Sequence, residues 1–169
     1  MAYLAEQEIL ELLKLIKSPL DGAHIPYWLG RGVFRHLYLH GVVGDRQSDI
    51  DIHIWREDSD RVKTALSNAL VGFNPADPEY KLAFTKDLAN NKQQIIEFMY
   101  LDFEQRDPDL VYHKRAENMK LYCPKECFPR ENVKTIRIGN IEFRVPSLAE
   151  RYFEGTYGLG WKLEDKYSC

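Results

Sequence analysis

The segment from Ser48 to Trp55 (S-D-I-D-I-H-I-W) alternates strictly between polar and apolar residues. Successive side chains of a β-strand point to opposite faces, so Asp49, Asp51 and His53 are predicted to share one face, with isoleucines on the other. Aspartate is disfavoured in strands, so two aspartates in a strongly β-forming stretch oppose the local propensity. The segment predicts a strand carrying a functional carboxylate pair; the alternative is an ordinary half-buried strand whose polar edge faces solvent.

The spacing of the two aspartates suits a divalent metal. Side chains two residues apart on a strand have Cβ atoms about 6–7 Å apart. Magnesium prefers hard oxygen ligands, and a carboxylate pair can bridge two ions about 3.5–4 Å apart. Asp49 and Asp51 are therefore candidate ligands for Mg²⁺ or Mn²⁺.

A glycine-rich turn, Gly30-Arg31-Gly32, precedes the acidic strand. It lies between a predicted strand at 25–29 and a predicted short helix at 33–39. Glycine lets a phosphate approach the backbone, and a helix N-terminus offers free N–H groups. Arg31, Arg35 and Arg46 could add charge-assisted contacts to phosphate. The alternatives are a simple turn and, for Arg46, a solvated side chain.

The remaining pattern predicts a mixed α/β (α+β) fold, with one mixed sheet flanked by helices in a single domain over 1–169. Residues 104–133 are predicted to be the least regular stretch, and they contain Pro108, Pro124 and Pro129. The predicted helices lie at about 2–17, at 58–70 and at 147–153, and the predicted strands at 80–85 and 94–101, with a hairpin of 134–138 and 141–145. The first helix has one apolar face and is expected to end at Ser18-Pro19. The last helix is expected to be capped by Ser147 and Glu150.

Composition excludes some classes of function. The 169 residues carry a formal net charge of −3, without the basic excess expected of a nucleic-acid binder. No apolar run approaches the roughly 20 residues that span a bilayer, and the acidic first residues do not resemble a signal peptide, so a cytoplasmic location is expected. Cys123 and Cys127 have a spacing that can begin a structural Zn²⁺ site with His113 or Cys169; two free thiols are the alternative.

Together these features resemble the nucleotidyltransferase superfamily typified by DNA polymerase β. That group pairs a glycine-rich turn with a downstream Asp-x-Asp strand and a third carboxylate on a neighbouring strand. Within it, the chain resembles the LicD and fukutin-related family over about residues 25–161. The matching residues are Tyr27-Trp28-Leu29, Gly32, His40-Gly41, Asp49-Ile50-Asp51, the segment 96–102 with Glu97 as the third acid, Phe128-Pro129, 143–146, Tyr157-Gly158 and Trp161.

The resemblance implies a metal-dependent transferase. It would move a phosphoalcohol, such as phosphocholine or phosphoribitol, or a nucleotidyl group from a CDP-alcohol or NTP donor to a sugar or glycan hydroxyl. Asp49 and Asp51 would hold the metal, and Glu97 would complete a second metal site or take the acceptor proton. The alternatives are a small nucleotidyltransferase that adenylylates a small molecule or protein, and a non-catalytic binding module.

Four positions depart from the LicD and fukutin-related pattern, one of them being Gln47, which stands where another acid is common. Arg31 stands where that family has glycine, Val33 where it has serine or threonine, and Glu97 where it has aspartate. The turn therefore lacks a hydroxyl that would touch phosphate, while glutamate reaches one methylene further than aspartate. Both the active and the non-catalytic interpretation stay open on the sequence.

Overall fold

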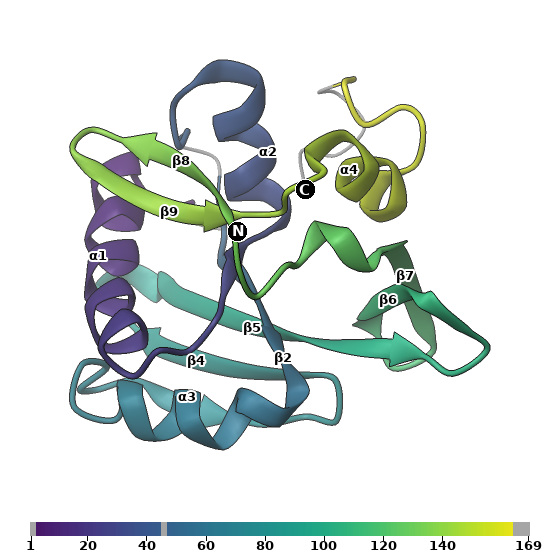
Figure 1. The fold of residues 1–169 in the computed structure, drawn as a ribbon. Helices are drawn as coiled ribbons and strands as arrows, with labels where there is room; N and C mark the ends of the chain where they lie inside the picture. Colours follow the sequence, from purple (N-terminus) through teal and green to yellow (C-terminus); the bar gives the residue numbers. More distant parts are fainter. Residues whose placement is uncertain (1–2, 45–46, 164–169) are drawn as a thin grey trace.

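A mixed β-sheet organises the protein in the computed structural model, which describes residues 3–44 and 47–163 (Figure 1). β2 and β5 run parallel, whereas the other pairs of neighbouring strands in this sheet are antiparallel. In spatial order the strands are β1 (Trp28–Leu29), β2 (Ile50–Trp55), β5 (Gln93–Glu104), β4 (Lys81–Asp87) and β3 (Asn74–Ala76). β5 extends beyond this core to pair with β6 (Asp107–Ala116), which pairs with β7 (Met119–Pro124).

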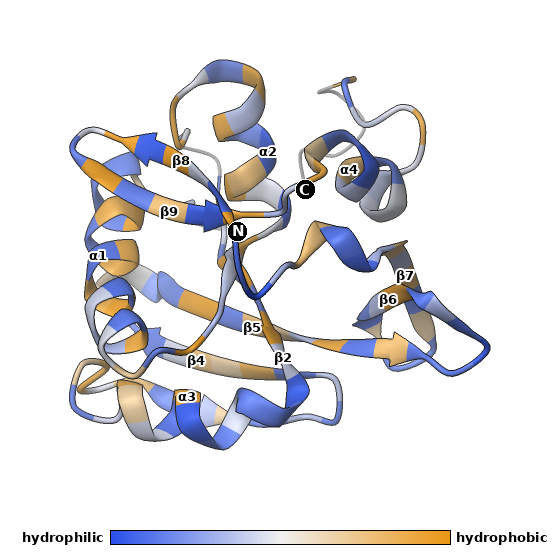
Figure 2. Ribbon diagram, in the orientation of Figure 1, coloured by the Kyte–Doolittle hydropathy of each residue, from blue (hydrophilic) through white to orange (hydrophobic). Residues whose placement is uncertain are grey.

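Within residues 3–44 and 47–163, four α-helices pack around the sheet: α1 (Glu6–Gly22), α2 (Arg31–His40), α3 (Ser59–Leu66) and α4 (Ala149–Tyr157). α1 contacts α3, while α2 contacts both β2 and α4. Figure 2 shows hydrophobic and hydrophilic residues alternating around α1, as expected of a helix with one buried face. The mixed α/β fold class is therefore confirmed.

β2 is more deeply buried than the alternating pattern predicts. All six of its residues are buried, so both faces of the strand are covered. The isoleucines on one face belong to the main core cluster. The other face packs against aromatic residues, because the His53 ring lies 5.2 Å from Phe128 and 5.4 Å from Tyr152. The alternative of a half-buried strand with a solvent-facing polar edge is wrong, because residues distant in the sequence cover the polar face.

The N-terminal helix begins and ends later than predicted. It starts at Glu6 rather than near residue 2, and it continues through Pro19 to Gly22. Proline removes one helical N–H, but Leu20 follows it on the apolar face and is fully buried. We attribute the continuation to this burial, since about 1.5–3 kcal/mol is gained for a fully buried leucine. The predicted end at Ser18-Pro19 is wrong.

The stretch predicted to be irregular, 104–133, contains the β6–β7 hairpin. Pro108 is the second residue of β6 and Pro124 is the last residue of β7. Proline is tolerated near strand ends, where a missing N–H removes little of the ladder. The prediction that this stretch is the least regular is therefore wrong for 107–124, which forms the hairpin. The alternating burial of Val111 and His113 is the period-2 signal of the missed strand.

The β8 (Lys134–Ile138) and β9 (Ile141–Val145) hairpin confirms the prediction, and Gly139 adopts the left-handed conformation that its turn requires. The predicted cap of the last helix is wrong. Helix α4 begins at Ala149 after the N-cap residue Leu148, without a side-chain cap hydrogen bond. The Ser147 hydroxyl is buried and has no hydrogen-bond partner among the described residues.

Gly155 sets the close packing of α4 against β7. A Cβ atom at this position would lie 2.0 Å from the backbone carbonyl oxygen of Tyr122, which cannot move aside as a side chain could. We expect Gly155→Ala to lower the free energy of unfolding by about 1–3 kcal/mol, the usual cost of overpacking a core. Urea denaturation followed by circular dichroism measures this change.

Gly22→Ala is the matched control for Gly155→Ala. Gly22 also lies in a helix, but a Cβ atom added to it would meet no packed neighbour within 4 Å. Its stability is expected to stay the same or rise by up to about 1 kcal/mol, because alanine restricts the unfolded chain. Equal stability of the two variants would contradict the close approach at Gly155.

Candidate functional site

Three carboxylates lie together at the start of β2 and on the neighbouring strand β5. Asp49 immediately precedes β2, Asp51 lies on β2 and Glu97 lies on β5. Asp51 and Glu97 are direct partners in the parallel register of these strands. One carboxylate oxygen from each residue lies within 4.8 Å of the others. Asp51 is only 5% exposed, so the alternative of a polar edge facing solvent does not describe it.

The donor set of this cluster fits a hard divalent cation. All three ligands are carboxylate oxygens, which Mg²⁺ and Mn²⁺ prefer. The Oδ1 atom of Asp51 is buried and lacks a hydrogen-bond partner in the described structure. A buried carboxylate oxygen is costly unless a charge or a hydrogen-bond donor compensates it. The cluster could therefore hold such a cation.

Burial and mutual repulsion raise the pKa values of both aspartates in the cluster. Burial, followed by the Asp49 charge, raises the pKa of Asp51 to about 7. Burial, followed by the Glu97 charge, raises the pKa of Asp49. A bound cation would favour the ionised forms, since metal ligands must be deprotonated. The charge state of the site is thus linked to metal binding.

Two basic side chains also face the carboxylates. The Nη1 atom of Arg31 lies 3.8 Å from Oδ1 of Asp51. Lys81, on β4, forms an ion pair with Glu97. Burial by itself lowers the pKa of Arg31, but the Asp51 carboxylate raises it and the net direction is upward. Arg31 and Lys81 therefore neutralise part of the negative charge of the carboxylates.

The Gly30-Arg31-Gly32 turn forms the start of α2 rather than a separate loop before a helix at Val33. Gly30 is the N-cap residue, and its amide donates to the carbonyl oxygen of Asp51 at 2.9 Å. A Cβ atom on Gly30 would lie 2.7 Å from Nε2 of His53. Glycine is required here because the turn sits directly against the acidic strand.

Arg31 adopts a backbone conformation that is unusual for a residue other than glycine. Its φ angle is +43°, and its amide donates to the Tyr152 hydroxyl at 2.8 Å. A left-handed conformation costs a non-glycine residue about 1–2 kcal/mol, so the surrounding contacts must hold it. The turn therefore directs the Arg31 side chain toward Asp51, but the Arg31 amide itself is already bonded within the protein.

Tyr152, on α4, is a functional candidate that sequence reasoning missed. Its buried hydroxyl accepts from Arg31 and can donate to Nε2 of His53 at 2.7 Å. His53 stays neutral, because burial and then His113 hold its pKa well below its usual range. Burial also lowers the pKa of His113 to about 3. No local pattern identifies Tyr152, which is 121 residues away from Arg31.

The other predicted phosphate contacts have different surroundings. Gly32 lies beside Gln47, whose Oε1 would be 2.4 Å from a Cβ on this glycine. The Arg35 guanidinium donates to the Trp161 carbonyl oxygen at 2.6 Å and lies over the Tyr157 ring. Arg46 lies outside the described residues.

Cys123 and Cys127 are buried free thiols. Among residues 3–44 and 47–163, neither belongs to a group of three or more close potential metal ligands, whereas a structural zinc takes four. His113, the suggested partner, packs beside the ring of His53, and Cys169 lies outside the described residues. The described geometry gives the zinc interpretation no third ligand.

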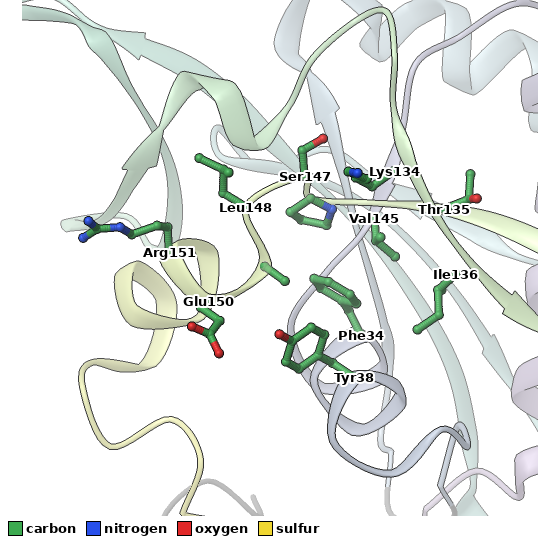
Figure 3. Close-up of a pocket in the computed structure, with 12 residues that line it drawn as sticks. Phe34, Tyr38, Lys134, Thr135, Ile136, Val145, Ser147, Leu148, Glu150 and Arg151 are labelled. Carbon is green, nitrogen blue, oxygen red and sulfur yellow. The ribbon is translucent and has the colours of Figure 1, made fainter.

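A cavity of about 460 Å³ lies between α2, the β8–β9 hairpin and the start of α4 (Figure 3). Phe34 and Tyr38 of α2 form one side, and Ile136 and Val145 of the hairpin lie opposite. Lys134, Glu150 and Arg151 add charges of both signs to the lining. Its volume is in the range of small-molecule pockets.

No helix among the described residues is long and apolar enough to cross a membrane.

The comparisons identify the fold. Neither a family model nor a curated protein matches the sequence. The antibiotic-resistance factor ANT(2'')-Ia matches in its solution structure with a TM-score of 0.55 and 17% identity, over 84% of this chain and 66% of that one. Its crystal complex with adenylyl-2''-tobramycin gives a TM-score of 0.57 at 17% identity, over 92% and 78%.

Two further structures give similar values. The lincosamide antibiotic adenylyltransferase LnuA, with bound lincomycin, has a TM-score of 0.53 and 13% identity, covering 88% of this chain and 84% of its own. An antigenic nucleotidyltransferase-like protein from Paracoccidioides brasiliensis has 0.56 and 18%, covering 99% and 77%. The chain therefore has the nucleotidyltransferase fold, as the superfamily resemblance predicted. These structures do not support the narrower LicD and fukutin-related resemblance.

Proposed function

We propose that this protein is a metal-dependent nucleotidyltransferase that transfers a nucleoside monophosphate from an NTP to a hydroxyl group of a small molecule. The observation that carries the proposal is the cluster of Asp49, Asp51 and Glu97 on adjacent strands of a nucleotidyltransferase fold. Two of the similar structures contain a small-molecule acceptor or product, lincomycin in one and adenylyl-2''-tobramycin in the other. These ligands favour a small-molecule acceptor over a glycan.

Each residue of the site has a chemical task in this proposal. Asp49 and Asp51 hold the divalent cation, which when bound neutralises phosphate charge and stabilises the transition state. Arg31 contacts the donor phosphates beside Asp51. The acceptor oxygen forms a bond to the α-phosphorus, pyrophosphate leaves, and the acceptor proton passes to Glu97 if Glu97 serves as the base.

The rival function is transfer of a phosphoalcohol from a CDP-linked donor to a sugar hydroxyl, which the same carboxylates could support. A third possibility is a binding module that has lost catalysis. Isothermal titration calorimetry separates the three, with Mg²⁺ present and ATP, CTP, GTP, UTP or CDP-choline as the titrant. Asp51→Asn is the matched control because it keeps the side-chain shape and removes the charge.

We expect Mg²⁺-dependent binding of at least one NTP, lost in Asp51→Asn, together with pyrophosphate release when aminoglycoside or lincosamide acceptors are supplied. Binding of CDP-choline in preference to every NTP would favour the rival transferase and overturn the proposal. The absence of any Mg²⁺-dependent nucleotide binding by a folded protein would overturn both enzymatic functions and favour the binding module.

A further inference from the structure

The acidic cluster carries less net charge than its three carboxylates suggest. With every group ionised, Asp49, Asp51 and Glu97 contribute −3, while Arg31 and Lys81 contribute +2, leaving −1. One divalent cation brings the total to +1, and two bring it to +3. Like charges at these short separations repel strongly when partly buried. The protein groups alone therefore balance one divalent cation much better than two.

The sheet register places Lys81 beside Glu97. Lys81 is opposite Met99 in the antiparallel β4–β5 pair, and Glu97 is two residues before Met99 on the same face. Lys81 and Glu97 are therefore diagonal neighbours, a separation that long side chains bridge. The ion pair follows from the backbone register rather than from a chance contact of surface side chains.

The surroundings of this pair hold it in place. The Lys81 side chain is 22% exposed and that of Glu97 is 15% exposed, so solvent screens their attraction only in part. The Lys81 ammonium also lies 5.6 Å from the centre of the Tyr80 ring, which attracts a cation. A divalent ion that recruited Glu97 would have to displace Lys81 from Glu97.

We propose that Lys81 occupies the place of a second divalent cation, so that Asp49 and Asp51 hold one ion and Glu97 stays outside its coordination shell. This inference rests on the proposed function and decides between the two tasks open to Glu97. Held by Lys81 through Oε1, Glu97 keeps its other oxygen for the proton of the acceptor hydroxyl. Lys81 is thus a positioning residue that acts through Glu97.

The test counts Mn²⁺ ions bound to the full chain by electron paramagnetic resonance, with Mn²⁺ alone as the probe. Wild type is expected to bind one ion. Lys81→Met and Lys81→Gln are expected to bind a second ion as well. Their affinity for this second ion should exceed that of wild type at least about tenfold, and the spectrum should broaden because the two Mn²⁺ ions lie about 4 Å apart. Lys81→Arg, which keeps the charge, is expected to restore a count of one.

Two tight Mn²⁺ ions in wild type would overturn the inference while leaving the proposed function standing. So would a count of one in both Lys81→Met and Lys81→Gln, provided that circular dichroism shows them to be folded. If neither wild type nor Asp51→Asn bound Mn²⁺, the proposed function would fail together with the inference. The outcomes are therefore distinguishable in one series of titrations.

Discussion

Asp51→Asn is expected to reduce nucleotidyl transfer by about 10³-fold or more while the protein remains folded. Asparagine has nearly the same shape as aspartate, so the packing of this 5%-exposed side chain is kept. The carboxylate charge that holds the cation is lost, and metal-assisted stabilisation of the transferring phosphoryl group is lost with it. Steady-state pyrophosphate release at saturating Mg²⁺ measures the effect. Asp49→Asn is expected to behave similarly.

Asp109→Asn provides a control with the same chemical change. The Asp109 side chain is 74% exposed on β6 and pairs with Lys125, outside the acidic cluster. Its transfer rate is expected to match that of wild type. Near-wild-type turnover in Asp51→Asn, with folding verified by circular dichroism, would remove the basis for placing the metal at these carboxylates.

Asp51→Asn is also expected to change the pH dependence of the free energy of unfolding in the metal-free protein. The pKa of Asp51 is about 7 in the folded state, against an ordinary value of 3.8. Between these values the unfolded chain has released the proton that the folded protein still holds, so the free energy of unfolding falls as pH rises. The full difference is on the order of 4 kcal/mol. Asp51→Asn removes it and is expected to be more stable than wild type at pH 8.

Urea denaturation between pH 4 and pH 8 in the presence of EDTA measures this linkage, with Asp109→Asn again as the control. Adding 10 mM Mg²⁺ at pH 8 is expected to stabilise wild type but not Asp51→Asn, because only the native site of wild type binds the ion. Parallel pH profiles for wild type and Asp51→Asn would show that Asp51 ionises at an ordinary pH.

The sequence identified the carboxylates because their signal is local. Strict alternation places Asp49 and Asp51 on a common face, and the resemblance to nucleotidyltransferases supplied Glu97. The direct pairing of Asp51 with Glu97 depends on the register of two strands that are distant in the sequence. No local pattern specifies such a register, so the prediction needed the resemblance to bring the third carboxylate to the site.

Long-range contacts also explain what sequence reasoning missed. Lys81 reaches Glu97 only through the β4–β5 register, and Tyr152 reaches Arg31 only because α4 packs beside α2. Proline gave misleading local signals at both Pro19 and Pro108, where burial and strand position outweigh the usual breaking effect. The element types were therefore more predictable than their limits or their partners.

The hydrogen bond from Arg31 to Tyr152 has a consequence for the order in which the protein matures. During translation, the glycine turn and all three carboxylates leave the ribosome before α4 is made. A nascent chain that stops short of Tyr152 lacks the hydroxyl that holds Arg31 in its left-handed conformation. Competence to bind a nucleotide is thus expected to arise only after α4 has left the ribosome and packed beside α2, so that chains without α4 stay inactive.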